Sequence, residues 1–568
     1  MKFLPKSLKN SSVTDSLLEK IYIRPTRILW HNDKVTDSEK IIENNDHQML
    51  AGESRMIRDY CYIAPGGALL VDFGKEICGG VKLFIKVMKD KDGNDKMDVS
   101  LRLRFGESAN EAMAELHESG TTNDHNPRDF TVQSGVMSMA EFGYTGFRFV
   151  RIDNLDKENT ILLVTVNAYA YFRDIEYKGS FKCDDAVLNR VFDTAAYTLH
   201  LCMQDYIWDG IKRDRLVWVG DMYPEVATLC SVFGDDTTVR KSLDIIRDST
   251  APDKFMNTII TYNAWWLLCH HRYYMQNGDK EYLKEQHSTI APMMHELSKY
   301  VGNDGRFDPR TAWALFDWPS NYSRELSDSG VHAIFKLMYE AASFLLSELG
   351  DEENSSFCKE ISEKLSKYDY PDYDYKQISA MRVLAGLRDA KTENERLLSK
   401  NGDSGISTFL GMFTFSARAV AQDMEGALSN IKGMYGKMLD IGATSFFEDF
   451  DPSWCENAGR IDELTPEGLD DVHGDRGAYC YVGFRHSLCH GWSSGVAAFM
   501  SEYILGIKVK APACREVEIS PQLGFLKFAE GTYPTPYGNI FVRHEKDENG
   551  NVTTNYTVPE QIKVTVRK

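Results

Sequence analysis

The stretch 184–203, DDAVLNRVFDTAAYTLHLCM, marks the point at which the hydrophobic period of this chain changes. Its apolar residues recur at spacings of three and four, which predicts an amphipathic helix. Before about residue 181 the apolar residues instead alternate with polar ones. We therefore expect strands on one side of this point and helices on the other.

The strands are predicted most clearly at 97–105, MDVSLRLRF. There Met97, Val99, Leu101, Leu103 and Phe105 alternate with polar residues, the period of a half-buried strand. The segments VKLFIKV and TILLVTVNAYAYF are similar, and turn residues such as DKDGND separate the runs. A β-sandwich is the natural closure for such strands.

Helical spacing continues after residue 203. The segment 332–350, HAIFKLMYEAASFLLSELG, ends in a glycine at the usual stop position. At usual helix and loop lengths, residues 181–510 would form about a dozen helices, a number that suits a barrel of paired helices. Strand alternation returns after APACREVEIS, at 511–520. The expected domains are a β-sandwich at 1–177, a helical barrel at 178–510 and a β-sandwich at 511–568.

The length and composition exclude several classes of function. With 568 residues the chain is too long for one compact core. A net charge of −19 without a long basic run excludes a nucleic-acid partner, and no 18-residue apolar run predicts a membrane span. The eleven cysteines form no CxxC pair and no signal peptide is visible, so we expect a cytoplasmic protein with reduced thiols.

Charged and aromatic residues are unusually mixed at 208–221, WDGIKRDRLVWVGD, which holds three aspartates, three basic residues and two tryptophans. Charged side chains normally lie in water and tryptophans normally do not. A solvated helix face with incidental tryptophans is the simplest explanation. Two more stretches, WALFDWP at 313–319 and GATSFFEDFDPSW at 442–454, also place acids beside aromatics. Three such stretches in one helical region favour a shared sugar pocket.

Two other motifs are weaker. GWSSG at 491–495 matches a serine-hydrolase pattern, but that pattern needs a strand before the serine and an acid and a histidine after it. Only His544 lies downstream. His486 and His490 have the spacing of a zinc helix without the glutamate of HExxH. We therefore expect neither a serine nucleophile nor a metal or other cofactor.

Together these stretches resemble the bacterial α-L-rhamnosidases of glycoside hydrolase family 78. The run 209–221 resembles the acidic signature of the family, D-x-x-x-R-E-R-x-x-W-x-G-D, and GATSFFEDF resembles its G-A-T-x-x-W-E segment. WALFDW is similar to W-x-x-x-D-W, and FRHSLCHGWSSG to S-L-C-H-x-W-x-x-G. VDFGKEICGGVKL and ISPQLGFLKFAEGTYPTPYG resemble strand segments of the sandwiches at the two ends of that family.

The resemblance implies a multidomain α plus β fold, with a central six-hairpin (α/α)6 barrel flanked by N-terminal and C-terminal β-sandwiches. It also implies hydrolysis of terminal α-L-rhamnosides with inversion, without an active-site metal. The expected partner is a glycoside or oligosaccharide, neither a nucleic acid nor a membrane is expected, and homo-oligomerisation stays open.

The resemblance assigns the general acid to Asp214 and the general base to Glu448. A helix starting near Arg215 would be capped by Asp214 and would place Trp218 and Asp221 on one face. The residues expected to contact the sugar are Asp209, Arg213, Trp218, Asp221, Trp313, Asp317, Trp318 and His490.

One departure from the family concerns the acid, because the family has Glu where this chain has Asp214. Its carboxyl reaches about 1.5 Å less, and a misplacement of about 1 Å can cost roughly a hundredfold in rate. A catalytically weak, sugar-binding member of the same fold is therefore one alternative. Another is a six-hairpin hydrolase or lyase for a different sugar such as an uronide, with Arg213 or Arg485 as a carboxylate clamp.

Overall fold

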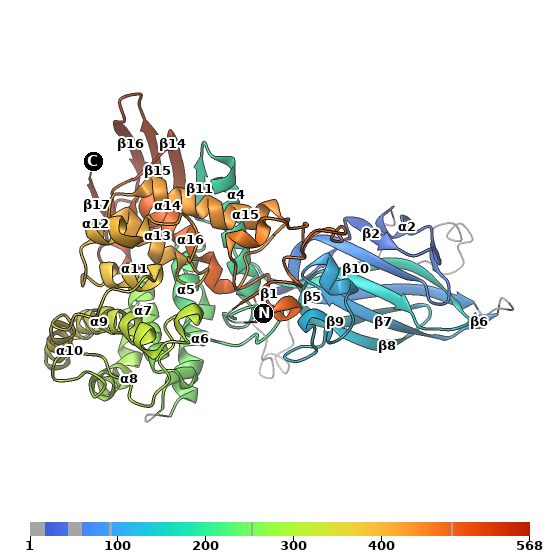
Figure 1. Ribbon diagram of the computed structural model, residues 1–568, viewed down its shortest axis with the longest axis horizontal. Helices are drawn as coiled ribbons and strands as arrows, with labels where there is room; N and C mark the ends of the chain where they lie inside the picture. Colours follow the sequence, from blue (N-terminus) through green and yellow to red (C-terminus); the bar gives the residue numbers. More distant parts are fainter. Residues whose placement is uncertain are drawn as a thin grey trace.

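The computed structural model describes residues 17–43, 60–89, 92, 94–251, 254–478 and 481–567. The molecule is elongated, with the N-terminal strands at one end and the helices and C-terminal strands at the other (Figure 1). The order of strands, helices and strands predicted from the hydrophobic period is therefore confirmed.

Among the described residues, ten N-terminal strands are hydrogen-bonded into one sheet, in which β3, β4, β10, β5, β9, β7 and β8 are successive neighbours. In addition, β1 pairs with β10, and β2 and β6 pair with β5. The long strand β5 pairs antiparallel with both β9 and β10. The strands are β1 (Leu18–Ile23), β2 (Arg27–His31), β3 (Val35–Thr36), β4 (Cys61–Ile63), β5 (Ala68–Lys89), β6 (Asp95–Lys96), β7 (Asp98–Gly106), β8 (Asp129–Gly135), β9 (Ser138–Asn154) and β10 (Thr160–Arg173).

The alternation at 97–105 predicts β7 with one error. Val99, Leu101, Leu103 and Phe105 are buried in the core of the sheet as expected. Met97 is 73% exposed instead, because the strand begins one residue later, at Asp98. Short helices flank these strands: α2 (Lys40–Glu43), α3 (Ala109–Met113) and η2 (Glu118–Gly120).

The stretch at which the period changes forms α4 (Ala186–Cys202). Asp185 caps it by accepting hydrogen bonds from the backbone N–H groups of Val187 and Leu188, at 2.9 and 3.2 Å. The segment 332–350 forms the end of α9 (Arg324–Glu348), and Gly350 follows it with the left-handed φ of 79° that favours glycine. Both predictions are confirmed.

The remaining helices follow one another through short connections, and neighbours such as α7 and α9, α9 and α10, and α11 and α13 pack together. The longer ones are α5 (Met222–Val232), α6 (Thr237–Ser249), α7 (Ile260–Asn277), α8 (Lys280–Ser298), α10 (Glu352–Leu365), α11 (Lys376–Leu384), α13 (Gly411–Val420) and α14 (Met424–Ile431). The shorter ones are η3 (Met256–Thr258), η4 (Trp318–Ser320), α12 (Ala390–Glu393), η5 (Asn394–Leu398), η6 (Lys432–Gly436), α15 (Lys437–Asp440), η7 (Pro452–Cys455), η8 (Gly483–Arg485), η9 (Gly491–Gly495), α16 (Val496–Phe499), η10 (Met500–Ile504) and η11 (Pro512–Cys514).

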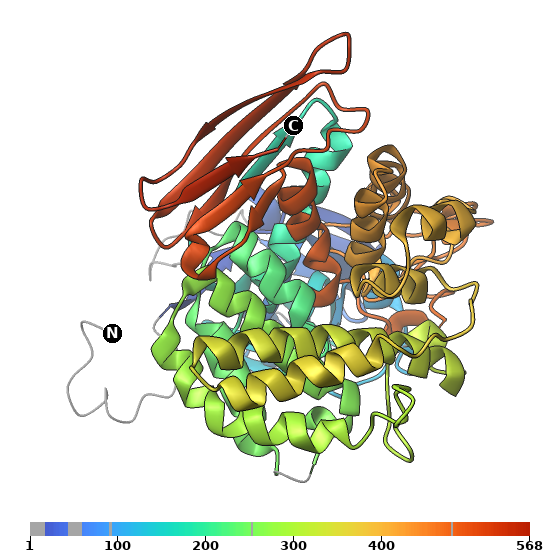
Figure 2. The same cartoon turned by 90° about the vertical axis from the view of Figure 1, so that its left-hand side faces the viewer.

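The C-terminal strands lie beside the helices in two sheets (Figure 2). One sheet is completed by β11, which precedes α4 in the chain and pairs with β14, so this sheet joins the two ends of the helical region. The strands are β11 (Ser180–Cys183), β12 (Ile507–Val509), β13 (Glu516–Ile519), β14 (Phe528–Thr535), β15 (Gly538–Lys546), β16 (Val552–Thr557) and β17 (Lys563–Val566).

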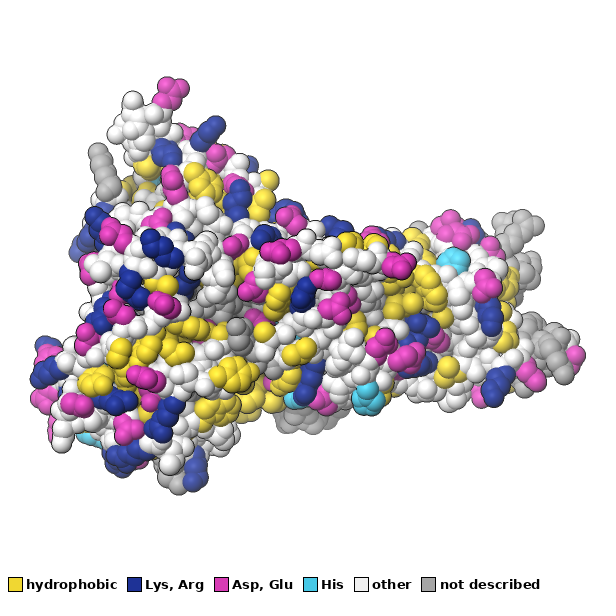
Figure 3. Space-filling view, viewed as in Figure 1, with side chains coloured by type: hydrophobic (Ala, Val, Ile, Leu, Met, Phe, Trp, Pro, Cys, Tyr) yellow, Lys and Arg dark blue, Asp and Glu magenta, His cyan; other side chains and the backbone are white. Residues whose placement is uncertain are grey.

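The surface mixes charges of both signs. Basic and acidic side chains are interspersed over the face drawn in Figure 3, without a continuous basic patch. Within the part of the chain that the structure describes, none of the helices combines the length and the apolar character needed to cross a membrane.

Candidate functional site

The loop 208–221 connects α4 to α5 and is not helical. The expected helix from Arg215 is wrong, because Asp214 and Arg215 both have a left-handed φ of 54° and α5 begins only at Met222. The carboxylate of Asp209 instead accepts a hydrogen bond at 2.9 Å from the backbone N–H of Leu216. Asp214 therefore caps no helix; it lies in a tight turn.

Arg213 joins the two predicted catalytic acids. Its Nη2 donates a hydrogen bond to Oε2 of Glu448, and its Nη1 lies 3.5 Å from Oδ2 of Asp214. The guanidinium is buried and lies 3.5 Å from the ring centroid of Tyr481. The structure therefore brings Asp214 and Glu448, which are far apart in the sequence, to the two ends of one guanidinium.

Glu448 is buried, and both its side chain and its backbone interact with neighbouring residues. Burial opposes the charged form, but Arg213 and His490 outweigh it and lower the pKa of Glu448 to about 2. The backbone carbonyl of Glu448 accepts a hydrogen bond at 2.9 Å from the indole N–H of Trp492. Glu448 is thus ionised over the whole range of neutral and mildly acidic pH.

A second group of acids surrounds His490. Its Nε2 lies 3.1 Å from Oδ2 of Asp221. Burial alone would lower the pKa of His490, but the carboxylates of Glu448, Asp221 and Asp209 raise it. Burial raises the pKa of Asp209 well above its usual range, against the opposing effect of His490, and the neighbouring Asp221 and Asp214 add to the increase. The four predicted residues Asp209, Asp214, Asp221 and His490 therefore form one electrostatic unit with Glu448.

The predicted stretch 313–319 lies next to this unit. Burial raises the pKa of Asp317 to about 7; a hydrogen bond from Ser407 opposes the increase and Asp449 adds to it. Oδ1 of Asp317 accepts a hydrogen bond at 2.9 Å from the backbone N–H of Trp318. Near neutral pH this carboxyl can therefore either donate or accept a hydrogen bond.

The predicted tryptophans gather around the start of α7. Trp313 and Trp318 pack edge to face with ring centroids 6.3 Å apart, and Trp313 is 44% exposed. Trp218 packs in the same way, at 6.2 Å, against Tyr262. The carbonyl of Trp313 accepts a hydrogen bond at 3.0 Å from the backbone N–H of Ile260, in the first turn of α7. Apolar ring surface is thus available beside the acids.

The weaker motifs have structural explanations. Ser493 is fully buried in η9, and its hydroxyl donates to the carbonyl of Phe447. His486 accepts a hydrogen bond at 2.9 Å from the backbone N–H of Asp449, and burial lowers the pKa of His486 to about 3. Residues 486–490 do not form the helix that a zinc pair would need.

Sequence reasoning missed one neighbour of Asp214 and one of Arg213. His125, from the segment between η2 and β8, has its Nδ1 2.6 Å from Oδ1 of Asp214. Tyr481 lies against Arg213. The polar run TTNDHNPRD at 121–129 is the only sequence signal that could have drawn attention to His125.

A further buried acid lies on α5. Glu225 is fully buried, and neither of its carboxylate oxygens has a hydrogen-bond partner among the described residues. Burial raises the pKa of Glu225 well above its usual range, and the carboxylates of Asp221 and Asp209 raise it further. These effects all favour the protonated form of this side chain.

One group of possible metal ligands occurs in the part of the chain that the structure describes, formed by Glu107, Glu111 and His473. Nζ of Lys212 lies 3.2 Å from Glu107 and 2.9 Å from Glu111. The ammonium group occupies the position between the carboxylates and balances their charge. This group is accordingly an ion-pair cluster that ties the N-terminal sheet to the loop 208–221.

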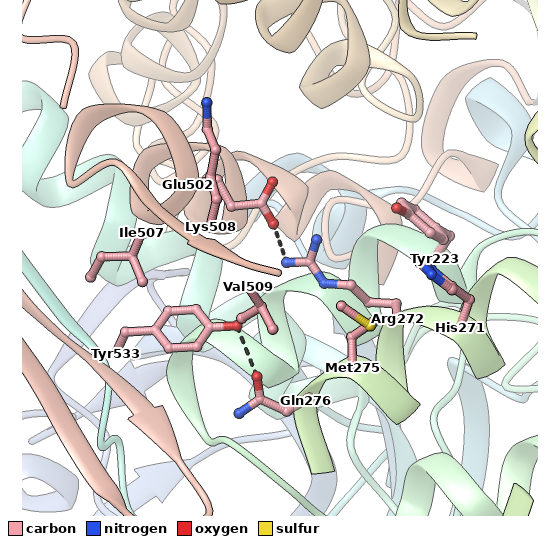
Figure 4. A pocket seen from close by; sticks show the side chains of 10 residues that line it. All are labelled: Tyr223, His271, Arg272, Met275, Gln276, Glu502, Ile507, Lys508, Val509 and Tyr533. Atoms are coloured by element: carbon pink, nitrogen blue, oxygen red, sulfur yellow. Dashed lines mark hydrogen bonds and ion pairs between the residues drawn. The ribbon is translucent and has the colours of Figure 1, made fainter. Parts of the chain in front are cut away.

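A cavity of about 160 Å³ lies between α7 and the strands β12 and β14 (Figure 4). Arg272 and Glu502 form an ion pair in it, and the hydroxyl of Tyr533 donates a hydrogen bond at 2.9 Å to Oε1 of Gln276. None of the residues predicted for the sugar pocket lines this cavity.

Two family models match the chain. The bacterial α-L-rhamnosidase six-hairpin glycosidase domain matches residues 176–357, and the bacterial α-L-rhamnosidase C-terminal domain matches residues 506–567. The resemblance predicted from the motifs is therefore confirmed for these two parts of the chain.

Similar proteins extend the match over most of the chain. An α-L-rhamnosidase of Alteromonas sp. (strain LOR) is 23% identical over 540 residues, which cover 87% of this chain and 55% of that protein. A glycoside hydrolase family 78 rhamnosidase of Bacillus sp. GL1 is 20% identical, with a TM-score of 0.70 over 93% of this chain and 55% of that one. A rhamnosidase of Klebsiella oxytoca, solved with rhamnose bound, is 18% identical, with a TM-score of 0.68 over 85% of this chain and 95% of that one. This chain thus spans about half the length of the first two and shares the fold of the Bacillus and Klebsiella proteins.

Proposed function

We propose that this chain, which carries the six-hairpin glycosidase and C-terminal domains of the bacterial α-L-rhamnosidases, hydrolyses terminal α-L-rhamnosides with inversion. The observation that carries the proposal is the buried guanidinium of Arg213, with Asp214 at one end and Glu448 at the other. Inverting hydrolysis needs two carboxyl groups on opposite sides of the scissile bond, roughly 6.5–9.5 Å apart.

In this mechanism Asp214 donates its proton to the glycosidic oxygen as the bond from that oxygen to C1 of the sugar breaks. Glu448 takes a proton from the water that attacks C1 from the other face. The low pKa of Glu448 keeps it ionised and ready to accept that proton. The water becomes acidic only as its oxygen bonds to C1, so a weak base suffices late in the reaction.

Recognition of the sugar follows from the surrounding groups. Asp209, Asp221 and His490 supply hydrogen-bond acceptors and a donor for the hydroxyls, and Asp317 can serve as either. The C5 methyl group makes one edge of rhamnose apolar, and Trp218, Trp313 and Trp318 offer ring surface for it. We assign these residues, together with Arg213, to the substrate pocket.

The proposal extends to the architecture. The paired helices are assigned to an (α/α)6 barrel at 178–510, flanked by β-sandwich domains at 1–177 and 511–568. The paired packing of α7 with α9 and α11 with α13 and the division of the strands between the two ends of the chain support this assignment. β11 extends the C-terminal sheet with residues that precede α4.

The ion pairs argue against an uronide as substrate. A carboxylate clamp needs an arginine that is available to the ligand, but Arg213 is bound to Glu448. Arg485 forms an ion pair with Asp124 at 2.6 Å. Both arginines thus already neutralise acids of the protein.

The test is turnover of p-nitrophenyl glycosides, with the α-L-rhamnoside compared against other sugars, including an uronide. We expect cleavage of the α-L-rhamnoside, and proton NMR during the first minutes should show the β anomer as the first product. An initial α anomer would require a covalent intermediate and a closer carboxylate pair. Binding of rhamnose without turnover of any glycoside would support the sugar-binding alternative.

A further inference from the structure

The N-terminal sheet region reaches into the proposed active site. The segment between η2 and β8 carries His125, whose Nδ1 lies 2.6 Å from Oδ1 of Asp214. The neighbouring Asp124 forms an ion pair at 2.6 Å with Arg485, in η8. The side chain of Asp214 is 14% exposed and that of His125 is 31% exposed. The proposed acid therefore has one neighbour from the helical region, Arg213, and one from the N-terminal region.

The turn that presents Asp214 is also held from the N-terminal sheet. The backbone N–H of Gly146, in β9, donates a hydrogen bond at 2.8 Å to the carbonyl of Ile211. Arg215 donates at 2.7 Å to the carbonyl of Tyr144 and packs over its ring. Left-handed backbone is unfavourable for residues other than glycine, so two such residues in succession require outside support. Here β9 supplies that support.

The two oxygens of Asp214 have different surroundings. Oδ1 is buried and lies 2.6 Å from Nδ1 of His125, but the two atoms are not aligned as a hydrogen bond; Oδ2 lies 3.5 Å from the nearest nitrogen of Arg213, too far for a good hydrogen bond. A hydrogen on Nδ1 of His125 would hold Oδ1 and leave Oδ2 to carry the transferable proton. This asymmetry is what a general acid needs.

We propose that His125 is a positioning residue for Asp214, by which the N-terminal region completes the active site. In the reacting complex the imidazole of His125 turns so that its Nδ1–H donates to Oδ1, which is buried without a hydrogen-bond partner among the described residues of the free protein, and the proton on Oδ2 faces the glycosidic oxygen. When this proton leaves and the C1–O bond breaks, the carboxylate that forms keeps the hydrogen bond from His125. The interaction strengthens as charge develops and so favours the transition state. This inference rests on the proposed glycosidase function.

The test compares three variants on two α-L-rhamnosides: a methyl glycoside, whose leaving group must be protonated, and a dinitrophenyl glycoside, whose leaving group need not be. His125→Ala removes the donor. His125→Asn retains an N–H at the position of Nδ1, and asparagine also tolerates the φ of 61° at this position. His31→Ala, on the exposed end of β2, is the control.

We expect His125→Ala to lower kcat by about 10–100-fold on the methyl glycoside and by no more than about threefold on the dinitrophenyl glycoside, with KM nearly unchanged. His125→Asn should recover most of the loss, and His31→Ala should match the wild type on both substrates. A wild-type kcat for His125→Ala on the methyl glycoside would overturn the proposal. Equal losses on both substrates without recovery in His125→Asn would also overturn it, because they would indicate a structural role.

Failure of the proposed function has a separate signature, which is a wild-type protein that turns over neither glycoside. The contact can then be measured without activity, by ¹⁵N NMR of histidine-labelled protein with the His125 signal assigned from His125→Asn. We expect the Nδ1 resonance of His125 to shift in Asp214→Asn. An unchanged resonance would overturn the positioning role independently of catalysis.

Discussion

Two buried polar regions of this molecule differ in how their charges are balanced. In the cavity of Figure 4, Arg272 is paired with Glu502 and Tyr533 with Gln276. In the region of Arg213, the acids outnumber the cations, and the pKa values of Asp209, Asp221 and Asp317 are all raised. Both regions lie between secondary-structure elements, so burial alone does not distinguish them.

The difference indicates which region acts on a ligand. A balanced buried pair needs no partner from outside, whereas a surplus of buried carboxylates destabilises the fold and persists where function requires it. Sugar hydroxyls can donate hydrogen bonds to each of these carboxylates. We therefore expect substitutions in the acid-rich region to affect turnover strongly, and substitutions in the balanced region to affect stability instead.

The largest effect is expected from Glu448→Gln. The amide keeps the size of the side chain but cannot take the proton from water, so kcat should fall by at least about 1,000-fold while rhamnose still binds. The matched control is Glu502→Gln in the balanced region, for which we expect activity within about twofold of the wild type. Turnover and rhamnose binding by calorimetry check both variants. Near-normal activity of Glu448→Gln would move the base elsewhere, with Asp449 the first residue to test.

A loss of about 100-fold is expected from Asp214→Asn on a substrate whose leaving group needs protonation. Asp214→Glu should also slow the reaction, because the extra methylene displaces the carboxyl from His125 in a turn built around the shorter side chain. Steady-state rates on alkyl α-L-rhamnosides check both variants. Full activity of Asp214→Asn would identify another residue as the acid, and the buried Glu225, whose pKa is raised, would be tested next.

These residues also show what the sequence alone can predict. The change of period at 184 locates the first helix, and the family resemblance finds Asp214, Glu448 and the residues around His490, because these signals are local in the chain. The turn at Asp214 cannot be found in this way. Its left-handed backbone depends on contacts with Tyr144 and Gly146 in β9, and local helix propensity predicts the opposite conformation.

His125 was missed for a related reason. It lies 89 positions before Asp214 in a polar segment that reads as an ordinary connection between strands. Its role depends on how the N-terminal sheet packs against the loop 208–221, which no local pattern encodes. Arg213 was predicted to contact the sugar, but the pair of acids that it joins is a property of the three-dimensional structure.

A smaller loss, about tenfold in kcat/KM, is expected from Asp317→Asn, which removes a hydroxyl acceptor. The same change should stabilise the protein at high pH. Because the pKa of Asp317 is raised to about 7 in the folded state, the native protein binds this proton more tightly than the unfolded chain. The contribution of the Asp317 carboxyl to the free energy of unfolding is therefore fully present below about pH 4, and it is lost as the pH rises through 7.

Thermal unfolding at two pH values checks the direction of this pH dependence. Asp317→Asn should raise the unfolding temperature above that of the wild type by less at pH 5 than at pH 8. Ionising this buried carboxyl costs on the order of 4 kcal/mol, an upper limit set by the increase in pKa. A melting-temperature difference that shrinks between pH 5 and pH 8 would contradict the assignment.

The smallest effect on turnover is expected in the balanced region, from the pair Arg272→Met and Glu502→Gln. Each single variant leaves one largely buried charge without its partner, so each should lower the free energy of unfolding by about 3 kcal/mol, the low end of the range for buried pairs, because both side chains are 19% exposed. The double variant removes both charges and should recover much of that loss, with a coupling of about 0.5–3 kcal/mol in a double-mutant cycle. All three should keep kcat on α-L-rhamnosides within about twofold, because neither side chain lines the acid-rich region. A tenfold loss of turnover in the stable double variant would show that the balanced cavity takes part in catalysis, and charge balance would then fail to separate the two regions.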